Sequence, residues 1–164
     1  MSEAGDSPRA DTVQTLLAFD VGGRRIGVAV GNTVSMSARE LGVLDMRDSG
    51  PDWATLDRWM REWRPTRLVV GDPATLDGGD QPVRRMARSF ARQVAARYSL
   101  PVEQVDERTS SIEAAQRFAA GRAAGQRCGL VALALDAVAA AIILERWLTE
   151  PGSRIPLAAE PPTT

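Results

Sequence analysis

Residues 15–31 read TLLAFDVGGRRIGVAVG, and this stretch decides the fold. Thr15 to Val21 is an apolar run typical of a buried strand, and Gly22-Gly23 can turn the chain. Arg25 to Gly31 is a second apolar run, so the sequence predicts a β-hairpin. Asp20 stands at the end of the first run, where a carboxylate is costly unless it is paired, hydrogen-bonded or bound to a metal. This pattern leaves two interpretations of Asp20: a functional carboxylate, or a turn aspartate bonded to nearby N–H groups.

Working outward, the apolar spacing predicts further strands and helices along the chain. Strands are expected at 40–46, 67–70 and 102–106, and helices at 51–63, 80–98, 110–120 and 130–148. Three strands joined tightly favour an antiparallel meander, whereas strands that alternate with helices favour parallel crossovers. The predicted fold class is therefore α/β, a mixed sheet flanked by helices.

The composition excludes several kinds of active site. The 164 residues contain no histidine, so a Ser-His-Asp triad and histidine metal ligands cannot exist. All 20 basic residues are arginine, which excludes lysine-based chemistry, and the lone Cys128 excludes a disulfide framework or a CxxC zinc site. What remains for chemistry is carboxylates, hydroxyls, arginines and any metal that the carboxylates can hold.

The ends of the chain differ in composition from its body. Residues 1–13 are polar and lack the apolar core of a secretory signal, so we expect a disordered segment. Residues 14–150 are expected to form one domain, and the proline-rich residues 151–164 a flexible tail. The longest apolar stretch, 130–144, is too short to cross a membrane. These features predict a cytoplasmic protein that does not associate with membranes.

Acidic residues from three segments are candidates for one site. Asp136 is the only polar residue in the apolar stretch 130–144, which predicts deep burial. The alternative is an aspartate paired with an arginine or facing a rim. Asp106 and Glu107 end a strand and lie on its opposite faces, so at most one of them can join Asp20. Three such carboxylates without histidine suit Mg²⁺ or Mn²⁺.

Arginines form a second group of candidates, for contacts with phosphate. The predicted helix at 80–98 carries no acid after residue 80, and three of its arginines are spaced four residues apart on one ridge. A solvated face is the equally weighted alternative. The candidates for nucleic-acid binding on this helix are Arg84, Arg85, Arg88 and Arg92, and those beside the first hairpin are Arg24 and Arg25.

Four ordered motifs together resemble the bacterial YqgF-type, or RuvX-like, family. They are LLAFDVGGRRIGVAVG from residue 16, LVVGDPATLDGGDQP from 68, DERTSSIEA from 106 and LDAVAAAIILE from 135. The resemblance implies an RNase H-like fold with a five-stranded mixed sheet flanked by helices. It also implies Asp20, Glu107 and Asp136 as catalytic, metal-binding acids, with Arg108 and Ser110 as nearby phosphate contacts. The sequence departs from the family pattern at Asp72, where an apolar residue is usual.

The resemblance implies a metal-dependent endonuclease that uses Mg²⁺ or Mn²⁺ and acts on structured nucleic acid. Family members are known as pre-16S rRNA nucleases and as Holliday junction resolvases. An rRNA precursor is the favoured substrate and branched DNA the alternative, with the ribosomal subunit as a further partner and a monomer or homodimer as the expected state. A non-catalytic nucleic-acid-binding assembly factor is a further alternative. An ATP-binding protein of the actin type is disfavoured, because that class closes two such domains over its nucleotide.

Overall fold

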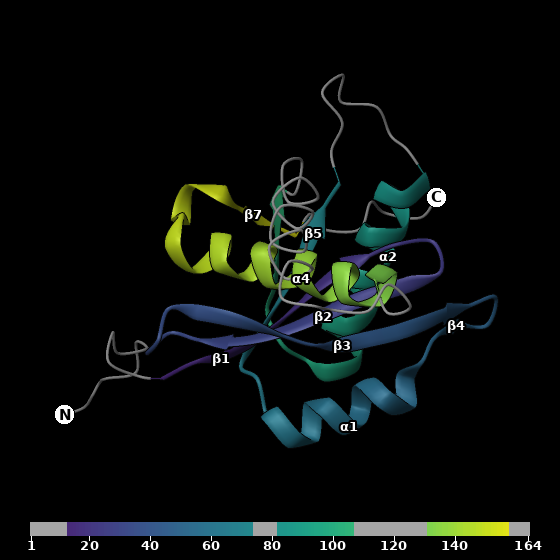
Figure 1. The fold of residues 1–164 in the computed structure, drawn as a ribbon, viewed down its shortest axis with the longest axis horizontal. Helices are drawn as coiled ribbons and strands as arrows, with labels where there is room; N and C mark the ends of the chain where they lie inside the picture. Colours follow the sequence, from purple (N-terminus) through teal and green to yellow (C-terminus); the bar gives the residue numbers. More distant parts are fainter. Residues whose placement is uncertain (1–12, 74–81, 107–130, 158–164) are drawn as a thin grey trace.

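The computed structural model describes residues 13–73, 82–106 and 131–157, and these build one layered α/β unit (Figure 1). The predicted strands and helices in this part of the chain are confirmed, whereas the predicted helix at 110–120 lies outside the described residues. The elements run in the order β1 (Thr15–Val21), β2 (Arg25–Asn32), β3 (Ser37–Arg47), β4 (Gly50–Pro51), α1 (Trp53–Trp63), β5 (Arg67–Asp72), α2 (Pro82–Tyr98), β6 (Val102–Asp106), α4 (Val131–Thr149), the short 3₁₀ helix η2 (Pro151–Ser153) and β7 (Arg154–Pro156).

The strands form one mixed sheet in the order β4-β3-β2-β1-β5-β6-β7. The first four are antiparallel neighbours, as the predicted meander requires, while β1, β5 and β6 are parallel to one another. The sheet has seven strands rather than the expected five. The two additional strands are short edge strands: β4 has two residues and β7 has three.

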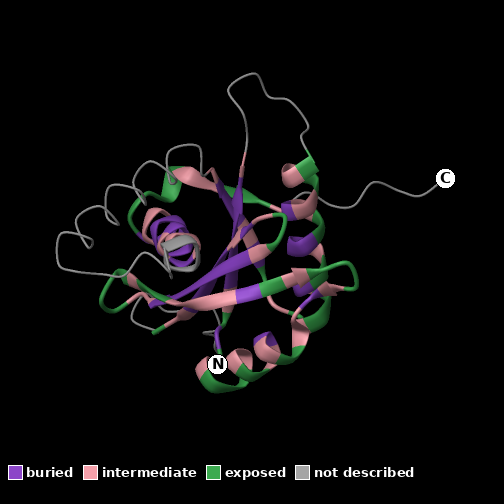
Figure 2. Cartoon of the chain, turned by 45° about the vertical axis from the view of Figure 1, so that its right-hand side comes forward, coloured by how far each residue is buried: buried purple, intermediate pink, exposed green. Residues whose placement is uncertain are grey.

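Helices cover both faces of the sheet, so its central strands are buried (Figure 2). Along β1, Leu17 and Phe19 pack with α1 and α2, whereas Leu16 and Ala18 pack against α4. This alternation follows from the two-residue period of a strand. It determines which face of the sheet each polar residue at a strand end occupies.

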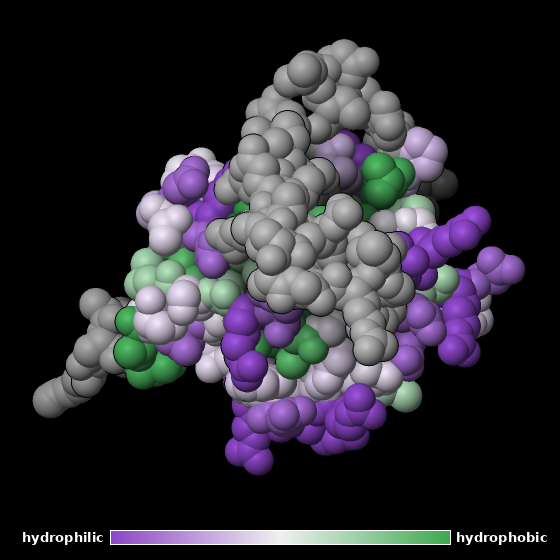
Figure 3. Space-filling view, viewed as in Figure 1, coloured by the Kyte–Doolittle hydropathy of each residue, from purple (hydrophilic) through white to green (hydrophobic). Residues whose placement is uncertain are grey.

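The helix α1 begins and ends where local chemistry requires it. The Asp52 side chain accepts a hydrogen bond from the Thr55 backbone N–H, an N-cap interaction. Arg64 ends the helix in the left-handed conformation, and Pro65 follows it. Hydrophilic residues gather over α1 along the lower edge of the molecule and at the right-hand edge near the β3–β4 turn (Figure 3).

Residues 151–157, within the segment expected to be a flexible tail, contain η2 and β7. The strand β7 pairs with β6, and the guanidinium carbon of Arg154 lies 3.7 Å from the centroid of the Trp147 ring. The indole N–H of Trp147 in turn donates to Glu103 Oε1 at 2.7 Å. Cation–π attraction and this hydrogen bond hold the segment against α4. The composition of the segment indicates disorder, but the partners of β7 and of Trp147 on β6 lie far away in the sequence.

In the described part of the chain, no helix is both long enough and apolar enough to cross a membrane.

Candidate active site

Asp20 lies near the carboxyl end of β1 and is half-buried. Leu16 and Ala18, which precede it at two-residue spacing, pack with residues of α4 such as Ile143 and Leu144. Because side chains alternate along a strand, Asp20 belongs to the same face of the sheet as α4. The strand thus places the Asp20 carboxylate beneath α4, at the end of the sheet where β1 finishes.

A glycine on β2, the strand next to β1, allows α4 to lie close to the strand pair that carries Asp20. Gly27 of β2 is the register partner of Asp20. A Cβ atom at Gly27 would collide with the backbone carbonyl of Asp136, so only glycine allows the helix to come this close. This close approach brings Asp136 beside the strand pair that carries Asp20. We call Asp20 and Asp136 the acid pair.

Asp136 is less buried than the apolar helix predicts, and it has an arginine partner. Its neighbours on α4, including Ala137 and Ala140, are buried, but the Asp136 side chain is 30% exposed. Arg25 Nε donates to Asp136 Oδ2 at 2.7 Å. The arginine-paired alternative is therefore what the structure shows. This geometry is also compatible with a functional role, because the carboxylate faces a rim rather than the core.

The third candidate acid, Glu107, lies outside the described residues, as do Arg108 and Ser110. The strand before it is well placed: Val105 packs in the same cluster as α4. Arg146 Nη1 of α4 donates to the backbone carbonyl of Asp106 at 2.6 Å, which joins the end of β6 to the helix. Within the ranges that the structure covers, no group of three acidic, cysteine or histidine side chains is arranged to hold a metal.

Arg84 of α2 makes an ion pair that the helix sequence does not reveal. Its Nε and Nη2 atoms donate to the two carboxylate oxygens of Asp72 at 2.9 and 3.2 Å. The Asp72 side chain is only 6% exposed, and it lies at the end of β5. As predicted, α2 itself carries no acidic residue beside its ridge of arginines. The acid that pairs with Arg84 comes instead from β5. The sequence signal for this ion pair was Asp72 itself, which stands where the family usually has an apolar residue.

The other candidate arginines differ in how far they are exposed. Arg85 is exposed, while Arg88 and Arg92 are half-buried on α2. Arg24 is exposed at the turn that follows Asp20, and its backbone carbonyl accepts a hydrogen bond from the Met46 N–H at 2.8 Å. The turn is therefore tied to β3, so the Arg24 side chain is presented from a fixed backbone.

A network of hydrogen bonds that shifts pKa values lies away from the acid pair, between α1 and α2. Hydrogen bonds from Arg97 and Tyr98 lower the pKa of Asp57 to about 2. Burial and the hydrogen bond to Asp57 raise the pKa of Tyr98. These three residues join the two helices, so the network serves the packing of that face.

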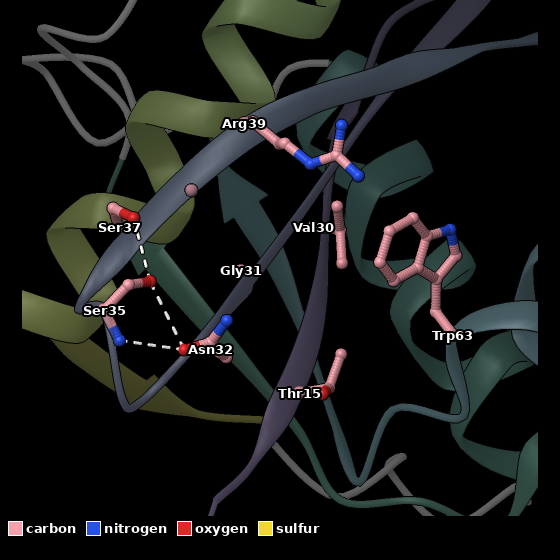
Figure 4. Close-up of a pocket in the computed structure, with 9 residues that line it drawn as sticks. Thr15, Val30, Gly31, Asn32, Ser35, Ser37, Arg39 and Trp63 are labelled. Atoms are coloured by element: carbon pink, nitrogen blue, oxygen red, sulfur yellow. Dashed lines mark hydrogen bonds between the residues drawn. The ribbon is translucent and has the colours of Figure 1, made fainter.

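A hollow of about 170 Å³ opens at the opposite end of the sheet (Figure 4). Thr15 lines it from the start of β1, roughly 17 Å along the strand from Asp20. The Asn32 side-chain oxygen in this hollow already accepts hydrogen bonds from the backbone N–H groups of Val34 and Ser35 at 2.9 Å. Arg39 lies over the Trp63 ring. These polar groups stabilise the β2–β3 turn, and the hollow is separate from the acid pair.

The mixed sheet with helices on both faces is an RNase H-like fold. Two solved structures share the fold: "T. thermophilus RuvC in complex with Holliday junction substrate" and "Thermus thermophilus RuvC structure". The first is 17% identical with a TM-score of 0.50 and covers 88% of this chain and 99% of its own. The second is 16% identical with a TM-score of 0.50, and the match covers 87% of this chain and 99% of the second structure's chain.

The family assignment comes from the sequence as a whole. The family model described as "RuvX: Holliday junction resolvase" matches residues 14–150, so the chain belongs to the RuvX family, a family of nucleases. A relative from Xanthomonas campestris pv. campestris (strain B100) is 56% identical over 151 residues, which are 92% of this chain and 96% of the relative. A relative from Xanthomonas axonopodis pv. citri (strain 306) is 58% identical over 137 residues, which are 84% of this chain and 88% of the relative. Both are named "Putative pre-16S rRNA nuclease".

Proposed function

We propose that this chain is a metal-dependent endonuclease that cleaves phosphodiester bonds during 5′-end maturation of pre-16S rRNA in the cytoplasm. The observation that carries the proposal is the convergence of Asp20 and Asp136 across Gly27. Two distant parts of the chain bring these acids to the same strand pair, on a fold shared with a protein solved in complex with a Holliday junction substrate. The names of the relatives support the choice of substrate.

The donor set fits a divalent cation. Asp20 and Asp136, together with Glu107, would hold one or two Mg²⁺ or Mn²⁺ ions, which prefer carboxylate oxygens. The Asp136 carboxylate already binds a cationic group, the Arg25 guanidinium, so its geometry suits a role in holding a cation. When bound, the cation would act as a Lewis acid on the phosphoryl group and favour attack by water.

Arginines would position the nucleic-acid backbone relative to the acid pair. Arg24 is exposed at the turn beside Asp20, and Arg85 is exposed on α2. Arg88, Arg92, Arg108 and Ser110 are the further candidates that we propose for this surface. Guanidinium groups bind phosphate oxygens in a fixed geometry, and they contribute affinity that falls as salt rises. Arg84 contributes to this surface indirectly, because its contact with Asp72 anchors the start of α2.

A Holliday junction resolvase is the second candidate, and the description of the family model favours it. Resolution of a four-way junction requires two symmetric cuts, and therefore a homodimer with paired sites. Cleavage of a pre-16S rRNA at its 5′ end requires a single site and no dimer. The two activities thus differ both in substrate and in the number of chains that act together.

Cleavage by the purified protein with Mn²⁺ or Mg²⁺ tests the proposal. A 5′ fragment of pre-16S rRNA and a four-way DNA junction are assayed side by side. Asp20→Asn and Asp136→Asn are the inactive variants, and Asp48→Asn, at an exposed acid on the β3–β4 turn, is the matched control. RNA cleavage that is lost only in the first two variants supports the proposal. Symmetric nicking of the junction would instead establish a resolvase.

Binding without cleavage under either metal would contradict catalysis and favour an assembly factor. The same preparation is therefore tested for binding of the RNA fragment at low salt. Full cleavage by both acid variants would show that another site performs the chemistry.

A further inference from the structure

The contact between Arg25 and Asp136 joins the two parts of the chain that build the acid pair. The Nε–Oδ2 distance is 2.7 Å, and the two side chains are 36% and 30% exposed. A charge-assisted hydrogen bond of this length in a partly buried place is stronger than an exposed surface pair. The carboxylate that would bind a cation is therefore already neutralised by this chain's own arginine.

The position of Arg25 on β2 explains why it reaches Asp136. Arg25 precedes Gly27 by two residues, so both belong to the α4 face of the sheet. Gly27 allows the backbone of Asp136 to rest on the strand. The Arg25 guanidinium therefore contacts the Asp136 carboxylate at the end of the sheet where β1 also places Asp20.

A second acid can receive the guanidinium if it leaves Asp136. Arg25 and Asp45 are register partners on β2 and β3, and the Cβ atoms of such partners lie about 5 Å apart. The Asp45 side chain is 63% exposed and only loosely paired with Arg47, at 3.7 Å. If Arg25 moves away from Asp136, its guanidinium therefore still has a negative charge nearby, the Asp45 carboxylate.

We propose that Arg25 is a built-in counter-ion that competes with a divalent cation for Asp136, an inference that rests on the proposed function. Two cations on one carboxylate repel each other, so binding of the divalent ion displaces the guanidinium. The released guanidinium, which has Asp45 beside it when no nucleic acid is bound, then contacts a phosphate when the substrate is present. Binding of the cation and of the nucleic acid are coupled through this one side chain. Arg25 is a positioning residue that acts on the acid pair.

Calorimetric titration of the nucleic-acid-free protein with Mn²⁺ tests the competition. Arg25→Gln is expected to bind Mn²⁺ about five- to tenfold more tightly than the wild type, because one neighbouring positive charge is removed. Arg58→Gln removes the same charge from an exposed arginine of α1, on the other face of the sheet, and is expected to keep the wild-type affinity. Equal Mn²⁺ affinity in the wild type and Arg25→Gln would overturn the inference.

A measurement on the wild-type protein covers the case in which Arg25→Gln does not fold. The Nε–H group of Arg25 gives its own NMR signal, assigned by its absence in Arg25→Lys. Titration with diamagnetic Mg²⁺ is expected to shift this signal and to speed its exchange with water as the guanidinium leaves Asp136. A signal that stays unchanged while Mg²⁺ binds would contradict displacement.

The coupling is measured with a non-hydrolysable RNA oligonucleotide. Mg²⁺ is expected to increase the affinity of the wild type for this RNA several-fold more than that of Arg25→Gln. An equal increase in both proteins would overturn the coupling. Failure of the proposed function has a different signature, since the wild type would then bind no divalent cation and cleave no substrate. A wild type that binds and cleaves, beside an Arg25→Gln with unchanged Mn²⁺ affinity, would refute only the role of Arg25.

Discussion

The backbone carbonyl of Asp136 packs against Gly27 so closely that no side chain fits between them. Gly27 is also the register partner of Asp20. One glycine therefore sets both the crossing point of α4 on the sheet and the separation between the two acids. Its importance is steric, because it is the absence of a Cβ atom that allows the contact.

Replacement of Gly27 by alanine is expected to push α4 away from β2. Forcing an extra methyl group into a packed contact costs about 1–3 kcal/mol in the free energy of unfolding. Mn²⁺ affinity is expected to fall as well, because Asp136 moves with the helix. Urea denaturation and calorimetric titration measure the two effects.

Gly23→Ala is the matched control for this prediction, because a Cβ at Gly23 meets nothing within 4 Å. It is expected to leave both the stability and the cation affinity near wild type. A Gly27→Ala protein with wild-type stability and affinity would show that α4 does not depend on this contact.

Arg84→Met is expected to destabilise the protein by about 3 kcal/mol. The substitution leaves the carboxylate of Asp72, whose side chain is 6% exposed, without the two hydrogen bonds that compensate its burial. The double variant Asp72→Leu/Arg84→Met removes both charges and is expected to recover most of the loss. Denaturation in urea measures the free energy of unfolding of each variant.

Arg47→Met provides the contrast, since the ion pair of Arg47 with Asp45 is exposed and 3.7 Å long. Such a surface pair contributes about 0–1 kcal/mol. A loss in Arg84→Met no greater than that in Arg47→Met would mean that the Asp72 contact is not a buried ion pair in solution.

The contact of Asp57 with Arg97 and Tyr98 is expected to make stability depend on pH under acidic conditions. Hydrogen bonds from Arg97 and Tyr98 lower the pKa of Asp57 from 3.8 to about 2. A lowered folded-state pKa stabilises the protein above the unfolded value and loses that effect as pH falls toward the folded value. The Tm advantage of the wild type over Asp57→Asn should therefore shrink between about pH 4 and pH 2.

Asp48→Asn serves as the control in the same pH range, because Asp48 is exposed on a turn. Its Tm difference from the wild type is expected to stay small throughout. A difference for Asp57→Asn that does not change between these pH values would argue against the lowered pKa.

Arg24→Gln is expected to weaken RNA binding and to reduce its dependence on salt. Each lost phosphate contact lowers the slope of log affinity against log salt by about 0.7–0.9. Fluorescence anisotropy at several salt concentrations measures this slope. Arg58→Gln, at an exposed arginine of α1, is expected to leave the slope unchanged. Equal slopes in all three proteins would exclude Arg24 from the nucleic-acid interface.

The fold was largely predictable because its signals are local. The apolar runs around Gly22-Gly23 specify the hairpin, and Pro65 marks the end of α1. The sheet is mixed because tight connections favour antiparallel pairing and intervening helices favour parallel pairing. The strand β7 was not predictable, since it depends on pairing with β6, which lies far away in the sequence.

The sequence by itself determined which chemistry is available: carboxylates at Asp20 and Asp136, arginines as the only basic residues, and no histidine. Only the tertiary structure decided which charges meet. Strand register places Gly27 beside Asp20, and the crossing of α4 then places Asp136 within reach of Arg25. The physical reason is that turns and periodic apolar patterns act between near neighbours, whereas ion-pair partners are chosen by packing between elements far apart in the chain.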